Sequence, residues 1–88
     1  MIIKVYGGLR QKAGGAQFPA AGGTVRQALQ ALCRQQPPLQ EAIFDADQLR
    51  PHVRVMVNGR DTELDQGLET PVFEADQIAI FPPMAGGW

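Results

Sequence analysis

The sequence is poor in the residues from which most metal, redox and nucleic-acid sites are built. Its 88 residues include one cysteine, Cys33, and one histidine, His52, so an internal disulfide and a multi-ligand Cys/His metal site are excluded. The formal net charge is -1 and no run of lysine or arginine occurs, which argues against a nucleic-acid-binding surface. No apolar run approaches the ~20 residues that span a bilayer, and residues 1–6 do not read as a signal peptide. We therefore expect a cytoplasmic protein that binds neither metal, nucleic acid nor membrane.

What remains is the composition of one small globular domain. Hydrophobic residues make up 44% of the chain and charged residues 19%, which is ordinary for a folded domain. A domain of this size buries only about two-thirds of the surface that its unfolded chain exposes, so a deep internal active site is not expected.

The first part of the chain predicts a hairpin and then the main helix. Residue types favour a strand over residues 2–6, a loop over residues 7–15 and a short return strand over residues 16–19. Thr24, with Gln27 three residues later, matches a capping box, in which the hydroxyl caps the helix and the glutamine reaches back to the cap. An apolar stripe at helical spacing follows: Val25, Ala28, Leu29, Leu32 and Cys33.

The middle of the chain predicts the end of this helix and a second hairpin. The proline pair at residues 37–38 ends the helix, and residues 39–44 predict a further helical turn. Valine alternates with other residues over residues 53–57, which indicates a half-buried strand. The Asn-Gly pair at residues 58–59 predicts a tight turn, and residues 61–64 a short return strand.

The last part predicts one more strand and then a tail. Residues 66–76 read as an irregular connection, and residues 77–81 as the final strand. The order of elements predicts an α+β domain in which a mixed sheet of four to five strands packs on one main helix. We expect one domain over residues 1–82 and a flexible C-terminal tail over residues 83–88.

The tail has a composition that suits insertion into another protein. Pro82 and Pro83 hold the chain extended as it leaves the last strand. Gly86 and Gly87 have no Cβ atom, so their backbone can enter a narrow channel and lie close to a partner's atoms. Such a segment suits a hydrophobic core poorly.

Several segments together resemble the ThiS/MoaD family of sulfur carriers. The ending at residues 80–87 is the most specific, because it joins a strand exit, a proline pair and a diglycine. The resemblance covers nearly the whole chain and implies a β-grasp fold, as in ubiquitin. The other similar segments are residues 76–80, residues 24–29, residues 9–14 and residues 57–59.

This resemblance implies a protein co-substrate, with no catalytic residue and no bound cofactor. A ubiquitin-activating-type adenylating enzyme would use ATP to convert the carboxylate of Gly87 to an acyl-adenylate. Sulfide would then displace AMP and leave a thiocarboxylate, which donates its sulfur to an accepting synthase. Met84, Ala85 and Gly86 would thread the channel of the partner.

Trp88 departs from the usual ending of the family, because it places the carboxyl group of Gly87 in a peptide bond. The chain is most similar to members with an extension after the diglycine, which a JAB/JAMM-type zinc peptidase trims. Those members serve cysteine, methionine or specialised sulfur-metabolite pathways. We therefore expect Trp88 to be removed before activation. The alternative is that Trp88 folds back on the sheet as a plug or is simply tolerated.

Two other functions stay open at this point. The first is the small subunit of molybdopterin synthase, in which the same tail enters a large subunit. The second is a ubiquitin-like modifier joined to lysines of other proteins, or a binding module with an inert tail.

The sheet face away from the helix is the predicted docking surface. We expect Phe81 and Met56 to anchor the activating enzyme there, because an apolar patch rimmed by charge marks an interaction site. The neighbours expected on the same face are Lys4, Tyr6, Arg54 and Ala79.

The remaining polar candidates are interpreted as structural. Cys33 lies on the apolar stripe and is expected in the core. His52 is expected on the surface of a strand, and the aspartates, among them Asp61, as solvated loop residues.

Overall fold

The computed structural model describes residues 1–82, and the predicted tail at residues 83–88 lies outside them. The described elements are β1 (Ile2–Val5), α1 (Gly8–Ala13), β2 (Gln17–Pro19), α2 (Val25–Gln35), α3 (Pro38–Ile43), β3 (Phe44–Asp45), β4 (Gln48–Leu49), β5 (Arg54–Val57), β6 (Arg60–Asp61), the 3-10 turns η1 (Thr62–Leu64) and η2 (Gly67–Glu69), and β7 (Gln77–Phe81).

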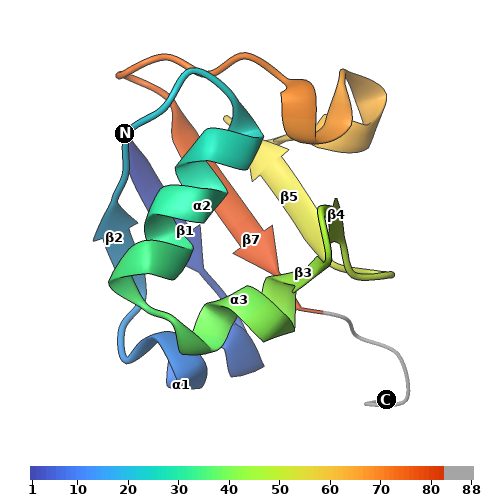
Figure 1. Cartoon of the computed structure of the whole chain (residues 1–88). Helices are drawn as coiled ribbons and strands as arrows, with labels where there is room; N and C mark the ends of the chain where they lie inside the picture. Colours follow the sequence, from blue (N-terminus) through green and yellow to red (C-terminus); the bar gives the residue numbers. More distant parts are fainter. Residues whose placement is uncertain (83–88) are drawn as a thin grey trace.

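The main sheet has five strands in the order β2-β1-β7-β5-β6. The first and last strands, β1 and β7, run parallel side by side, with Val5 opposite Ile80, and the other neighbours are antiparallel. Figure 1 shows α2 and α3 on one face of this sheet and α1 at the end toward which β7 runs. This mixed sheet confirms the predicted α+β class and the β-grasp arrangement.

The core lies between α2 and the sheet. Every residue of the predicted stripe on α2 is buried, because apolar side chains at helical spacing share one face. Each valine or leucine side chain of this stripe contributes about 1.5–3 kcal/mol when it is fully buried. The sheet supplies the facing layer, in which five side chains are at most 1% exposed: Ile3, Val5, Val55, Ile78 and Ile80.

The start of α2 follows the predicted capping pattern with one difference. Thr24 has extended backbone angles, and its hydroxyl oxygen accepts from the Gln27 amide at 3.2 Å. The side-chain oxygen of Gln27 accepts from the Gly23 amide at 2.7 Å, one residue before the cap. The hydrogen bond from Gln27 therefore satisfies the amide of Gly23 and not that of Thr24, and it ties the glycine turn to the start of the helix.

Residues 8–13 form the helix α1, so the loop predicted over residues 7–15 is wrong there. Leu9 and Ala13 lie one turn apart on this helix and are both buried. Gly14 ends it in a left-handed conformation, and its amide donates to the Arg10 carbonyl at 3.0 Å. The flanking glycines are helix boundaries, which is why the segment resembles a loop in the sequence.

The second hairpin is confirmed at its turn, but its return strand is shorter than predicted. Asn58 and Gly59 have φ values of 51° and 83°, as the tight turn requires. Only residues 60–61 pair with β5, and the chain then enters η1. The hydroxyl of Thr62, which is buried, donates to the Val55 carbonyl at 3.1 Å and draws the chain out of the sheet.

Two further features go beyond the sequence prediction. The predicted turn after the proline pair is the full helix α3, with Pro38 in its first turn, and it is followed by the small sheet of β3 and β4. The connection at residues 66–76 also contributes to the interior. Its buried residues are Leu68, Thr70 and Val72.

Candidate docking face and tail exit

The face of the sheet opposite α2 carries the side chains that were predicted to point outward. Met56 lies opposite Ala79 in the register of β5 and β7, and Arg54 lies opposite Phe81. Met56 and Phe81 are therefore diagonal neighbours, a spacing that large side chains bridge. A hollow of about 330 Å³ lies over this face, and its lining includes Lys4, Tyr6, Met56, Ala79 and Phe81.

Phe81 is held in one orientation by an aromatic stack. Its ring lies on that of Tyr6, with 4.7 Å between centroids and 10° between planes. The guanidinium carbon of Arg10 lies 5.9 Å from the Tyr6 centroid, and Arg10 Nε donates to the Val5 carbonyl at 3.3 Å. A stacked pair contributes about 0.5–1.5 kcal/mol beyond its buried area. The last residue of β7 thus presents a fixed, half-buried aromatic surface.

Asp61 holds Arg54 beside this aromatic surface. The Nε and Nη2 atoms of Arg54 donate to Asp61 Oδ2 at 2.9 and 2.5 Å, and the Glu63 amide donates to Asp61 Oδ1 at 2.9 Å. The hydrogen bond from the Glu63 amide, and then Arg54, lower the pKa of the Asp61 carboxyl group. Asp61 is 8% exposed, so its interpretation as a solvated loop residue is wrong.

The chain leaves the sheet between β1 and the Arg54 end of β5. The Tyr6 amide donates to the Ile80 carbonyl at 3.1 Å, and the ring of Pro82 then packs directly against Gly7. The position of Pro82 is therefore set by contacts between residues from both ends of the domain.

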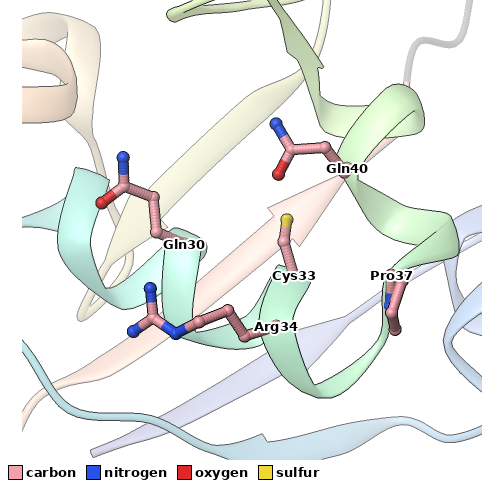
Figure 2. Close-up of a pocket in the computed structure, with 5 residues that line it drawn as sticks. All are labelled: Gln30, Cys33, Arg34, Pro37 and Gln40. Atoms are coloured by element: carbon pink, nitrogen blue, oxygen red, sulfur yellow. The ribbon is translucent and has the colours of Figure 1, made fainter.

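A second hollow lies on the helical side of the molecule, between α2 and α3. Figure 2 shows the Cys33 sulfur directed into it, with Gln30 and Arg34 from the same helix, and Gln40 across from α3. Cys33 is 5% exposed, and burial raises the pKa of its thiol to about 11. The thiol is therefore neutral near neutral pH, and the predicted core role of Cys33 is confirmed.

The described residues contain no candidate metal site. Within residues 1–82, no three or more histidine, cysteine, aspartate or glutamate side chains are grouped to hold a metal ion. His52 is exposed and has a φ of 69°, in a turn before β5 and not on the strand as predicted. None of the helices up to residue 82 has the length and apolar character needed to cross a membrane.

The predicted site residues fall into two groups. Phe81 and Met56 come together on the face of the sheet opposite α2, the open face, next to the point where the tail begins. The residues predicted to thread the channel, to carry the sulfur or to be removed lie outside the described part of the chain: Met84, Ala85, Gly86, Gly87 and Trp88.

Sequence reasoning missed three residues of the face and exit. Arg10 reaches Tyr6 because Gly7 turns the chain from β1 into α1, and this turn leaves no regular spacing in the sequence. Asp61 could have been found as the cap of a turn, because aspartate side chains often accept a hydrogen bond from the amide two residues later, here that of Glu63. The packing of Gly7 on Pro82 joins residues far apart in the chain and leaves no local signal.

Known proteins resemble this chain over almost its whole length. The model of the ThiS family matches residues 3–87. A proposed sulfur carrier protein of Archaeoglobus fulgidus is 34% identical over 88 residues, which cover 99% of this chain and 100% of that protein.

Solved structures agree with this result. The small archaeal modifier protein 1 of Methanosarcina acetivorans superposes with a TM-score of 0.90 at 30% identity, covering 98% of this chain and 94% of that one. A chain in the BexX/CysO complex of Amycolatopsis orientalis superposes with a TM-score of 0.88 at 26% identity, and 98% of each chain is covered. The β-grasp fold derived from the strand order is therefore shared with these proteins.

Proposed function

Because this chain belongs to the ThiS family of small β-grasp proteins, we propose that it is a sulfur carrier whose Gly87 carboxyl group becomes a thiocarboxylate. The observation that carries this proposal is the extent of the family match. It runs through the whole domain and ends at Gly87, the second residue of the diglycine. The proposed sulfur carrier of Archaeoglobus fulgidus, which aligns over the same length, supports it.

The chemistry proceeds on the tail and in a partner enzyme. A carboxylate oxygen of Gly87 attacks the α-phosphorus of ATP, and pyrophosphate leaves. Sulfide then attacks the acyl carbon, the bond from carbon to the phosphate oxygen breaks, and AMP leaves. The product is a thiocarboxylate, a nucleophilic sulfur that stays attached to the carrier until a synthase accepts it.

Trp88 is removed before activation in this proposal. Its amide bond occupies the carboxyl group of Gly87, so adenylation requires hydrolysis of the Gly87–Trp88 bond. The indole is also much larger than the glycines before it, and a channel shaped for a diglycine would exclude it. A zinc peptidase of the JAB/JAMM type is the expected catalyst, with water adding to the Gly87 carbonyl carbon.

The described residues supply docking and presentation. Phe81 and Met56 offer an apolar surface directly before the tail, with Arg54 at its edge. An adenylating enzyme that covers this face holds the root of the tail at a fixed place. Such binding favours the entry of Met84, Ala85 and Gly86 into its channel, because the reacting carboxylate is then supplied intramolecularly.

Intact mass spectrometry of the protein isolated from its own cells tests this function. A species that lacks Trp88, with one carboxyl oxygen replaced by sulfur, is the expected result. A chain truncated after Phe81 in the same cells provides the control, since it cannot carry the modification. Full-length protein alone, under conditions in which the sulfur pathway is active, would contradict the proposal.

A second function is favoured by the modifier proteins among the structural relatives. In that case a lysine amine of another protein, in place of sulfide, attacks the activated carboxyl group of Gly87. AMP is again the leaving group. The two functions share activation and differ in the acceptor. Isopeptide-linked adducts that retain the Gly86 and Gly87 remnant on lysine would identify the modifier.

A further inference from the structure

We propose that Gly7 is a positioning residue, whose missing side chain forms the seat for Pro82 and fixes the direction in which the chain leaves the sheet. This inference rests on the proposed function, because a tail that enters a partner's channel benefits from a defined exit. Gly7 and Pro82 both belong to the described part of the chain.

The seat joins segments from opposite ends of the domain. Gly7 follows shortly after β1 and Pro82 directly follows β7, and these strands are parallel neighbours, so both residues leave the sheet at the same edge. A Cβ atom at Gly7 would lie 2.7 Å from Cγ and 3.1 Å from Cδ of Pro82. Carbon atoms pack at about 3.5–4.0 Å, so the proline ring already fills the place of a side chain at Gly7.

The support beneath the seat is rigid. Gly7 has φ 60° and ψ -144°, a conformation that glycine adopts far more readily than other residues. It turns the chain from β1 into α1, and its carbonyl accepts from the Arg10 amide at 3.0 Å. Because α1 is anchored by the buried residues Leu9 and Ala13, Gly7 cannot move aside without moving this helix.

Pro82 depends on packing because it has no amide hydrogen with which to extend the ladder. At this end of the sheet the Tyr6 amide bonds to the Ile80 carbonyl, and the stack of Tyr6 on Phe81 follows. The contact with Gly7 is the next restraint along the chain. A proline ring is tied to its own backbone, so a shift of Cγ and Cδ turns the chain itself.

Among the described glycines, only Gly7 makes its close contact with a distant segment of the chain; Gly22 is equally crowded, with a Cβ atom 2.7 Å from Cβ of Gln27, but by its own neighbouring helix. A Cβ atom at Gly8, Gly14, Gly59 or Gly67 would meet nothing within 4 Å. The rest contact residues only a few positions away in the chain. Gly14 also has a positive φ, 73°, at the other end of α1, and it therefore serves as the control for a strained glycine away from the exit.

The chain carries its own reporter pair for the exit direction. It contains one tyrosine, Tyr6, and one tryptophan, Trp88, so energy transfer from Tyr6 to Trp88 reports the distance across the tail. Gly7→Ala in the full-length chain is expected to change the transfer efficiency. Gly14→Ala is expected to leave the efficiency at the parent value, although it also strains a left-handed residue.

A double-mutant cycle separates the contact from backbone strain. Gly7→Ala and Pro82→Ala are measured alone and together by urea unfolding, because strain at residue 7 is the same in both backgrounds. We expect Gly7→Ala to cost less stability in the Pro82→Ala background, where the ring is gone. Pro82→Ala alone changes the energy transfer as well, which keeps the test open if Gly7→Ala does not fold. Additive stability costs together with unchanged energy transfer would overturn the proposal.

Activation kinetics connect the seat to the proposed function. With chains that end at Gly87 and the adenylating enzyme of the same genome, ATP–pyrophosphate exchange is measured against carrier concentration. Gly7→Ala is expected to raise KM by about three- to tenfold with kcat nearly unchanged, because fewer molecules present the tail in the binding direction. Equal KM values for Gly7→Ala and Gly14→Ala would contradict the role of Gly7. If the parent chain is not activated at all, the proposed function fails, while the fluorescence and the cycle still decide on the seat.

Discussion

Replacing Phe81 by aspartate should abolish tight binding of the adenylating enzyme while leaving the fold intact. Phe81 ends β7 on the open face and is diagonal to Met56, at the root of the tail. Aspartate suits this test, because it lies opposite Arg54, whose positive charge limits the cost of the new carboxylate in the free protein.

The size of the effect follows from what a partner gains at this position. Full burial of a phenylalanine side chain contributes about 1.5–3 kcal/mol, and the stack on Tyr6 has already covered part of Phe81. About 1 kcal/mol therefore remains to be gained on docking. A carboxylate forced against an apolar partner surface costs about 1–3 kcal/mol more. The sum of about 2–4 kcal/mol corresponds to binding that is weaker by a factor of about 30 to 700.

The assay is titration calorimetry of the adenylating enzyme with chains that end at Gly87. Phe73→Asp is the matched control, since Phe73 is 71% exposed and does not line the open-face hollow. Thermal melting of each variant shows whether it still folds. Loss of the aromatic stack in Phe81→Asp is expected to lower the free energy of unfolding by about 1 kcal/mol. Equal dissociation constants for Phe81→Asp, Phe73→Asp and the parent chain would refute the docking role of Phe81.

Three further outcomes test the described structure. Because the folded-state pKa of Asp61 is lowered, its carboxylate stabilises the protein above an unfolded-state pKa of about 3.9, and this contribution is lost as the pH falls through the folded-state value. Asp61→Asn keeps an acceptor for the Glu63 amide but loses the charge facing Arg54. It should therefore narrow the difference between the free energies of unfolding in urea at about pH 7 and about pH 3. An unchanged difference would contradict the stabilising role of the Asp61 carboxylate. Thr24→Ala removes the hydroxyl that caps α2 and should cost about 1 kcal/mol, seen by calorimetry as a melting temperature about 4–8 °C lower. Thr24→Ser keeps the hydroxyl, so equal melting temperatures for Thr24→Ala and Thr24→Ser would argue against the cap. Cys33 should react with a thiol reagent roughly 100-fold more slowly in the folded chain than in urea, because burial raises its pKa to about 11; equal rates would place the thiol at the surface.

Most regular elements of the domain were predictable because their patterns are local. The apolar stripe of α2 repeats at helical spacing, and all of its residues are buried. The last strand is β7 with the predicted bounds, since a short apolar run stands between an acidic turn and a proline pair. The turn at Asn58 and Gly59 followed from two residues that tolerate a positive φ.

The errors arose where distant contacts outweigh local propensity. Glycines around residues 8–13 suggested a loop, but the burial of Leu9 and Ala13 in the core makes the segment helical. The return strand after Asn58 was predicted too long, because Thr62 bonds to the Val55 carbonyl and leaves the sheet. Neither contact has a signature within a short window of sequence.

The proposed tail segment and the face of the sheet beside it leave different signals in the sequence. The diglycine with its proline pair indicated the proposed reactive segment through family resemblance, because that resemblance lies in these residues themselves. The outward side of Phe81 and Met56 followed from strand alternation. Their arrangement as diagonal neighbours required the pairing of β5 with β7, which alternation alone does not specify.

The sequence by itself determined the α+β class, the capped main helix and the final strand, because each depends on residues that are neighbours in the chain. Only the tertiary structure decided how the tail leaves the domain. The parallel pairing of β1 with β7 brings Tyr6 onto Phe81 and Gly7 against Pro82, although these residues lie at opposite ends of the domain. Such contacts form when the whole core packs, so their geometry follows from the fold and not from any local pattern.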